Sequence, residues 1–287
     1  MKSRLRAFIT VVAWAGAVLA PSNGFAWGRE GHEIVAAIAR DHLDPVVATK
    51  AERLLQAAGL PDFIAVASWA DTYRFSHPET ENFHFTDIPL SASSYNPARD
   101  CHGGPGGDAA ETCSVAKIND FTSILADPAR TDVDRGVALA FLIHLVGDVM
   151  QPLHSADNHD RGGNLVHVSF FGAAEDHGRP LNLHAVWDTL ALSRLYGKSD
   201  PAGIARQIDP GGAAPVYDPD NIGIEVVAWA EESHRYAQSV AYGALPAGRD
   251  PALDADYLSR AAPVIQHQLV AAGYRLAGLV TCALRKK

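Results

Sequence analysis

The sequence predicts an all-α protein, a mainly α-helical single domain with one small β-hairpin. Apolar residues recur at helical spacing along most of the 287-residue chain, which is typical of helices that bury one face. Segment 164–171 instead alternates well enough to indicate a strand of a hairpin. Because no Pro/Ser-rich linker, low-complexity tract or internal repeat divides the chain, we expect one domain over residues 27–287.

The first 26 residues are expected to be a secretory signal peptide. Three basic residues within the first six positions precede an apolar run over 7–20 that is short for a membrane span. Small residues occupy the −3 and −1 positions before a cleavage site expected after Ala26. Cleavage would remove three cations, lowering the formal net charge from −9 to −12, and would make Trp27 the N-terminal residue. We therefore expect an exported protein, periplasmic or extracellular, without a membrane anchor.

The helices are predicted in order from periodicity and from signals for helix starts and turns. Aspartate–proline pairs at 44–45, 127–128 and 250–251 mark turns or helix starts. We expect helices at about 30–58, 114–126, 134–150, 184–197, 221–242 and 254–284. These ranges leave little of the chain for β-structure, which supports the all-α prediction.

Two of the three cysteines lie on either side of a glycine-rich loop. A disulfide between Cys101 and Cys113 would close this short loop and would persist in the oxidising compartment that a signal peptide predicts. Cys282 falls in the last predicted helix, where we interpret it as a small apolar residue outside the disulfide.

Histidines and carboxylates at regular spacing are the most informative residues of the chain. His144 and Asp148, like His184 and Asp188, are four residues apart in segments expected to be helical, so each pair projects from one helix face toward a shared ion. Imidazoles mixed with carboxylates, without cysteine, are the donors of catalytic zinc sites. One such pair is common by chance, but two pairs close in sequence indicate a multi-metal site. The other candidate ligands are Trp27, His32, Asp71, His84 and His154.

These residues stand in seven ordered motifs. The motifs are Trp27-Gly28-x-x-Gly31-His32, Ser68-Trp69-Ala70-Asp71-x-Tyr73-Arg74, His84-Phe85-x-Asp87, His144-x-x-Gly147-Asp148, Gln151-Pro152-Leu153-His154, Gly162-Gly163-Asn164 and Asn182-Leu183-His184-x-x-Trp187-Asp188. In this order they resemble the zinc-dependent single-strand-specific nucleases of the S1/P1 type, which include fungal enzymes and plant bifunctional nucleases. A more distant similarity is to zinc-dependent phospholipase C.

The resemblance implies a phospholipase C/nuclease P1-like helical fold with a trinuclear zinc cleft. Carried over by position, the first zinc ion would be bound by Asp71, His84, His144 and Asp148, the second by His154, His184 and Asp188, and the third by Trp27, His32 and a bridging Asp148. Trp27 would bind through its α-amine and carbonyl, so signal cleavage would complete that site. The implied activity is endonucleolytic cleavage of single-stranded DNA and RNA to 5′-phosphorylated products, together with 3′-nucleotidase activity.

The resemblance also implies residues that act on the substrate. Asp71 would orient the attacking water or accept its proton, and Arg74 would bind a phosphate oxygen with its fork of donors. Phe85 would stack on a base that Asp87 hydrogen-bonds, which suits unpaired bases of any sequence. The plainer interpretations are a surface ion pair for Arg74 and Asp87 and a core aromatic for Phe85.

Two alternative functions remain open. A secreted zinc phospholipase C has a similar three-zinc pattern, but the aspartate at 188, where that family has glutamate, and the motif at 84–87 favour the nuclease. A non-catalytic zinc-binding protein is the other alternative, although structural zinc sites are usually rich in cysteine.

The negative net charge of the chain is unusual for a protein that binds nucleic acid. Bound divalent ions would, however, make the electrostatic potential at the cleft positive. We expect a monomer that binds single-stranded nucleic acid and 3′-nucleotides as substrates, without a stable protein partner.

Overall fold

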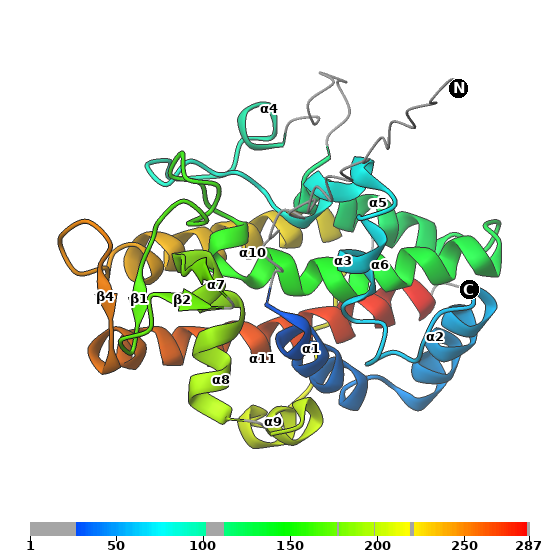
Figure 1. The fold of residues 1–287 in the computed structure, drawn as a ribbon. Helices are drawn as coiled ribbons and strands as arrows, with labels where there is room; N and C mark the ends of the chain where they lie inside the picture. Colours follow the sequence, from blue (N-terminus) through cyan, green and yellow to red (C-terminus); the bar gives the residue numbers. More distant parts are fainter. Residues whose placement is uncertain (1–26, 102–111, 177, 198, 219–220, 286–287) are drawn as a thin grey trace, which may run out of the picture.

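The computed structural model describes residues 27–101, 112–176, 178–197, 199–218 and 221–285. The expected signal peptide, 1–26, lies outside the described residues. Helices dominate the rest, in agreement with the all-α prediction (Figure 1). The α-helices are α1 (Arg29–Asp41), α2 (Pro45–Ala57), α3 (Trp69–Tyr73), α4 (Pro97–Asp100), α5 (Ser114–Ala126), α6 (Asp132–Met150), α7 (Leu183–Ala185), α8 (Ala191–Tyr196), α9 (Pro201–Ile208), α10 (Ile222–Tyr236) and α11 (Ala255–Arg285).

Helix α6 is the centre of the fold. Thr131 caps its first turn by accepting a hydrogen bond from the Asp134 N–H at 3.0 Å. Almost every residue from Gly136 to Met150 is buried, because the helix is apolar on all sides and is therefore suited to a core. Helices α1, α2, α5, α10 and α11 pack around it (Figure 1).

Helix α11 is the longest element and packs against both α1 and α6. Gly273 allows its close approach to α1, because a Cβ at this position would lie 2.5 Å from Cγ2 of Ile38. In the described parts of the chain, no helix combines the length and apolar character needed to cross a membrane.

The helix predictions differ from the structure mainly where helices are interrupted. The predicted helix at 30–58 is two helices, because Asp44 caps a new helix by accepting a hydrogen bond from the Val46 N–H at 2.9 Å. The segment predicted at 184–197 is α7, a π-helical turn η3 (Val186–Leu190) and α8, and the one at 221–242 is α10 followed by a second π-helical turn, η4 (Ala237–Ala241). Short helices α3, α4 and α9 were not predicted.

The β-structure is smaller than predicted and partly displaced. Strand β1 (Ser169–Phe170) pairs in parallel with β4 (Ala252–Leu253), and β2 (Glu175–Asp176) forms an antiparallel hairpin with β3 (Arg179–Pro180). The strand predicted over 164–171 was therefore wrong at its start. There the Leu165 and Val166 N–H groups bond to nearby carbonyls of Asp160 and Gly163 in turns, and antiparallel pairing begins with the isolated bridge between His167 and Asn182.

Cys101 and Cys113 form the expected disulfide, and both residues are buried. Cys282 is half-buried on α11. The loop 102–111 that the disulfide closes lies outside the described residues.

Candidate metal centre

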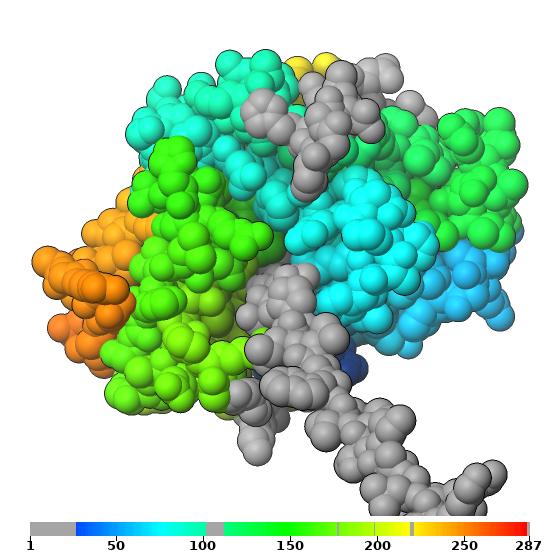
Figure 2. Space-filling model, turned by 45° about the horizontal axis from the view of Figure 1, so that its top comes forward, coloured from blue at the N-terminus to red at the C-terminus, as the bar shows by residue number. Residues whose placement is uncertain are grey.

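The predicted histidine and aspartate ligands come together in three buried groups. Each group offers ligand atoms within 4.8 Å of one another, and every member is at most 5% exposed. The groups are His32 with His144 and Asp148, Asp71 with His84 and His144, and His154 with His184 and Asp188. The cyan part of the chain with α3 and the lighter green part with the β2–β3 hairpin share one face of the molecule (Figure 2).

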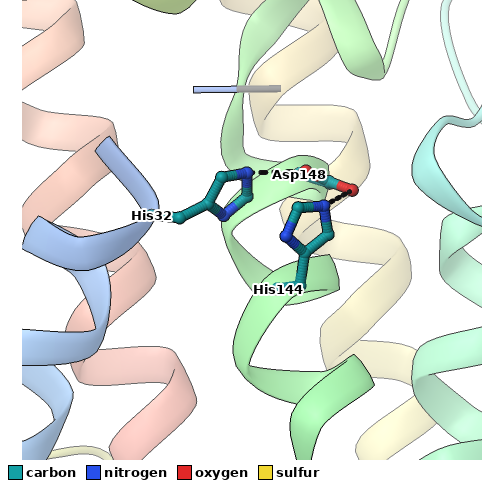
Figure 3. A group of neighbouring side chains, drawn as sticks. All are labelled: His32, His144 and Asp148. Atoms are coloured by element: carbon teal, nitrogen blue, oxygen red, sulfur yellow. Dashed lines mark ion pairs between the residues drawn. The ribbon is translucent and has the colours of Figure 1, made fainter. Parts of the chain in front are cut away.

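Two core helices supply the first group (Figure 3). On α6, His144 Nε2 lies 3.2 Å from Asp148 Oδ2 one turn later. From α1, His32 Nε2 lies 3.3 Å from the other carboxylate oxygen of Asp148, and the rings of His32 and His144 stack with centroids 3.9 Å apart. Gly147 leaves room for this approach, because a Cβ there would lie 2.8 Å from His32 Nδ1.

The second group adds residues from α3 and from the 3₁₀-helix η1 (Pro78–His84). His84 Nδ1 lies 2.9 Å from Asp148 Oδ2 and 3.0 Å from His144 Nε2. Asp71 Oδ1 is 3.8 Å from His144 Nε2 and 3.9 Å from His84 Nδ1. The Asp148 carboxylate therefore lies between His32 on one side and His84 on the other, where it can bridge two cations.

The third group lies on short helical turns. His154 ends the 3₁₀-helix η2 (Pro152–His154), His184 lies on α7, and Asp188 lies on the π-helical turn η3. His184 Nε2 is 3.0 Å from His154 Nε2 and 3.1 Å from Asp188 Oδ2. Single π-helical turns are rare and frequently occur at functional sites.

Backbone carbonyls determine which nitrogen of each imidazole carries the proton. His154 Nδ1 lies 2.7 Å from the His84 carbonyl, and His184 Nδ1 lies 2.7 Å from the Gly162 carbonyl. A carbonyl only accepts, so each Nδ1 is the protonated nitrogen and the two Nε2 lone pairs face each other at 3.0 Å. His144 is oriented in the same way by the Ala67 carbonyl at 2.8 Å. Such facing lone pairs cannot bond to each other, whereas a cation between them satisfies both.

Two carboxylates of the site also have a buried oxygen without a hydrogen-bond donor among the described residues. These oxygens are Asp71 Oδ2 and Asp188 Oδ2, and such a state is costly for a charge. Burial raises the pKa of both carboxyls. Burial and the neighbouring His184 lower the pKa of His154 to about 3, so it is a neutral ligand. Burial would also lower the pKa of His144, but the Asp148 and Asp71 charges raise it to about 9, so a metal ion binding at its Nε2 would have to displace a proton. The donor set therefore fits divalent metal ions.

Gln151, which precedes Pro152 in the fifth motif and was not predicted to have a role, positions Asp188. Its Nε2 donates to Asp188 Oδ1 at 2.6 Å, while its Oε1 accepts from the Leu153 N–H. It thus connects the end of α6 to the third group. A glutamine directly before a proline at a helix end was the available signal.

Trp27 is wholly buried where α1 meets η3. A Cβ on the next residue, Gly28, would lie 2.6 Å from Thr189 Oγ1 and 3.4 Å from the Asp188 carbonyl oxygen. The start of the expected mature chain thus lies close to the third group. No other described residue bonds to the indole Nε1.

Of the predicted substrate residues, Arg74 lies beside Asp71 of the second group, and Phe85 and Asp87 follow His84 in sequence. Arg74 is only 7% exposed and its Nη2 lies 3.5 Å from Asp71 Oδ1, so the surface ion pair that was its plainer interpretation is not what the structure contains. Phe85 follows His84 in extended backbone, with φ −146° and ψ 164°, and is half-buried. Asp87, two residues on, is exposed.

Comparison with known proteins gives a consistent result. The S1/P1 nuclease family model matches residues 27–285. Nuclease P1 of Penicillium citrinum and Nuclease S1 of Aspergillus oryzae are each 28% identical to the chain over 277 residues, covering 88% of this chain and 96% and 90% of those proteins. Endonuclease 2 of Arabidopsis thaliana is 32% identical over 175 residues, which cover 59% of this chain and 57% of that protein. The chain belongs to the S1/P1 nuclease family.

Proposed function

We propose that this protein hydrolyses phosphodiester bonds of single-stranded DNA and RNA at a centre of three zinc ions, releasing 5′-phosphorylated products. Its family membership supports a hydrolytic nuclease, and its three metal-capable groups support metal-dependent hydrolysis. One observation carries the proposal. In a buried site, imidazole nitrogens face each other through their lone pairs, and carboxylate oxygens beside them have no hydrogen-bond donor among the described residues.

The ligands are assigned to the ions by position in the family motifs. The first ion would be held by the second group, Asp71, His84 and His144, together with Asp148. The second ion would be held by the third group, His154, His184 and Asp188. The third ion would be held by His32 and Asp148 of the first group and by the amine and carbonyl of Trp27. When bound, zinc supplies Lewis acidity that acidifies water and neutralises charge on the phosphate. A set of imidazole and carboxylate donors suits zinc and disfavours the ions that prefer oxygen ligands alone, Mg²⁺ and Ca²⁺.

The side chains around the ions then have distinct roles. Asp71 orients the attacking water and accepts its proton, since its Oδ2 has no hydrogen-bond donor among the described residues. Arg74, held beside Asp71 at 3.5 Å, donates to a phosphate oxygen. Phe85 stacks on the base next to the scissile bond and Asp87 accepts from that base. A base held in this way is unpaired, which gives the single-strand preference.

The same centre is proposed to remove the 3′-phosphate of nucleotides. Both reactions break a bond to a 3′-oxygen, so substitutions of the metal ligands should abolish them together. We further propose that residues 1–26 are a signal peptide, that residues 27–287 form the exported nuclease domain, and that this domain acts as a monomer in the periplasm or outside the cell.

The decisive experiment compares two N-termini. We expect zinc-loaded protein beginning at Trp27 to cleave single-stranded DNA to 5′-phosphorylated products, and the same protein with one extra alanine before Trp27 to be at least 100-fold slower, about the loss that a damaged metal site causes. Zinc per chain should fall by one in the extended form.

Inactivity of the correctly processed form would contradict the nuclease. Hydrolysis of phosphatidylcholine vesicles would then support a phospholipase C, and zinc binding without either hydrolysis would support a non-catalytic protein. Equal activity of the two forms would contradict the N-terminal zinc site alone.

A further inference from the structure

We infer that the Cys101–Cys113 disulfide positions the base-binding segment Phe85–Asp87, so that it governs recognition of the nucleobase rather than metal binding or hydrolysis. The inference rests on the proposed function for the role of Phe85 and Asp87. The disulfide acts through the two residues that flank it in sequence, Asp100 and Ser114.

Hydrogen bonds from both sides of the disulfide hold this segment. The Ser114 N–H, next to Cys113, donates to the Phe85 carbonyl at 3.0 Å. The Asp87 N–H donates at 3.2 Å to the carbonyl of Asp100, next to Cys101. The disulfide joins these two flanks with a Cα–Cα distance of 4.8 Å, and it therefore sets the separation of the groups that bind residues 85 and 87.

A buried hydroxyl pair strengthens one side of this clamp. Thr86 Oγ1 lies 2.7 Å from Ser114 Oγ, and both residues are wholly buried. The Val115 N–H also donates to Thr86 Oγ1, at 3.4 Å. In addition, the Thr86 N–H donates to the His154 carbonyl at 2.8 Å, which fixes the segment relative to the metal centre.

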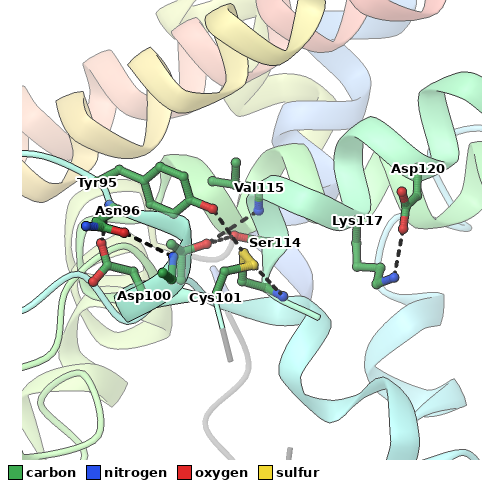
Figure 4. Close-up of a disulfide and its surroundings, with 11 residues drawn as sticks. Tyr95, Asn96, Asp100, Cys101, Ser114, Val115, Lys117 and Asp120 are labelled. Carbon is green, nitrogen blue, oxygen red and sulfur yellow. Dashed lines mark hydrogen bonds and ion pairs between the residues drawn. A yellow bond between two sulfur atoms is a disulfide. The ribbon is translucent and has the colours of Figure 1, made fainter. Parts of the chain in front are cut away.

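The two flanking residues, Ser114 and Asp100, lie in helices of different stability, and this difference is why a covalent link between them matters. Ser114 begins α5, a 13-residue helix that packs against α6. Asp100 ends α4, which has only four residues and is too short to be stable by itself. Among the described residues, the Asp100 carboxylate accepts hydrogen bonds only from the same short segment, namely from Arg99 and the Asn96 N–H. The disulfide thus attaches a weakly supported flank to a rigid one (Figure 4).

The metal ligands are held by bonds other than those of the two flanks. The carbonyls of Ala67 and Gly162 orient His144 and His184. The His84 carbonyl, directly before Phe85, orients His154, and the Thr86 N–H donates back to the His154 carbonyl, so this end of the segment stays attached to the metal centre without the disulfide. Loss of the disulfide should therefore let Phe85 and Asp87 move while the ligands keep their positions. A base-bearing substrate would lose its contacts, whereas a substrate without bases has none there to lose.

The test uses the Cys101→Ser, Cys113→Ser double variant of the chain beginning at Trp27. Its kcat/KM on a single-stranded oligonucleotide should fall at least tenfold, mainly through KM, while kcat/KM on an oligonucleotide of the same length with abasic sites in place of the bases should change less than twofold. Zinc per chain should be unchanged. The control is Asp120→Asn, an exposed residue of α5 that pairs with Lys117 (Figure 4), and it should leave kcat/KM on both substrates unchanged.

A binding measurement keeps this test independent of turnover. By calorimetry, the double variant should bind a nucleoside 5′-monophosphate at least tenfold more weakly than the wild type, but ribose 5-phosphate equally well. If the wild type binds the nucleotide but does not cleave DNA, the proposed nuclease activity is contradicted. The effect of the disulfide on nucleotide binding can still be measured by comparing the wild type with the double variant.

If the double variant does not fold, Thr86→Val keeps the disulfide and the side-chain shape but removes the hydroxyl bonds. It should show the same selective loss, about threefold, at the low end of what the loss of such hydrogen bonds costs. An equal loss on base-bearing and abasic substrates, or no loss on either, would overturn the inference.

Discussion

The helix half and the loop half of the metal centre are built in different ways. In the helix half, which comprises His32, His144 and Asp148, long core helices hold the side chains. In the loop half, which comprises His154, His184 and Asp188, short helical turns hold them, and the Gly162 carbonyl orients His184 at 2.7 Å. Packing positions the first set, whereas backbone hydrogen bonds of a loop position the second.

The loop behind the loop half, residues 156–164, has an unusual backbone. His159 and Arg161 have φ of 59° and 60°, in the left-handed region that side chains rarely adopt. Carboxylates keep this shape. Asp157 Oδ1 accepts from the N–H groups of Asp160 and Gly162 at 3.2 Å, and Asp160 Oδ1 accepts from the Gly163 N–H at 2.8 Å and the Tyr242 hydroxyl at 2.7 Å. Strain of this kind concentrates at functional sites, so this half should respond to changes in the backbone that the helix half would not experience.

The largest effect is expected in the helix half, from Asp148→Ala. The carboxylate lies between His32, His84 and His144, so its loss should remove the ligand that is proposed to bridge two ions and lower nuclease activity by more than about 100-fold. Zinc per chain, measured by mass spectrometry under native conditions, should fall by at least one. Asp134→Asn, at the exposed start of the same helix, is the control. Full zinc content in the alanine variant would contradict the bridging position.

The next effect should be confined to the loop half, from Gly162→Ala. Gly162 has a φ of +61°, and a Cβ there would lie 2.4 Å from the Leu153 carbonyl oxygen and 3.5 Å from His184 Nδ1. The carbonyl that orients His184 must shift, and zinc affinity at one site should fall about 10- to 100-fold. In a competition titration with a chelator, one zinc ion should be removed more easily than in the wild type, while the other ions should be removed as in the wild type.

Gly172→Ala is the matched control for that substitution. Gly172 has a φ of +83°, but a Cβ there would meet no atom within 4 Å. This variant carries comparable backbone strain without the clash, so its zinc affinities should equal those of the wild type. Equal weakening in both glycine variants would mean that the effect is global destabilisation and not displacement of His184.

Gln151→Met should have a smaller effect on the same half. Methionine has nearly the volume of glutamine but cannot donate to Asp188 Oδ1, which Gln151 reaches at 2.6 Å. We expect about tenfold weaker binding of one zinc ion, with Asp188 still present as a ligand. An unchanged chelator titration would show that the π-helical turn alone positions Asp188.

The two halves also differ in how far the sequence predicted them. Residues four apart on one helix face are visible in a sequence, so His144 and Asp148 were found with the helix that holds them. The pair His184 and Asp188 was found in the same way, but the π-helical turn between them was not, because periodicity cannot distinguish it from an α-helix. Gly162 was recognised only through a motif, since its contact with His184 links residues 22 apart. Contacts of that kind depend on the folded chain and leave no local pattern.

The smallest effect concerns the support behind the helix half. Glu232 on α10 accepts from Arg275 on α11, and Arg275 also contacts Met150 at the end of α6. Burial alone would raise the pKa of Glu232, but the hydrogen bond and charge of Arg275 lower it below the usual value. The folded state therefore binds this proton less readily than the unfolded state. The stabilisation is complete above the unfolded pKa of about 4.3 and is lost as pH falls through the lower folded pKa.

Glu232→Gln should consequently lower the free energy of unfolding by about 0.5–1 kcal/mol at pH 7, a value reduced because the pair is partly solvated. Urea denaturation of wild type and variant should give curves that differ at pH 7 and converge as the pH is lowered below about 4, the range of an unpaired glutamate. Zinc affinities at pH 7 should be the same in both proteins, because the ion pair supports α6 from outside the ligand groups. A constant difference in stability across this pH range would assign the effect to packing around Met150 and not to the charge of Glu232.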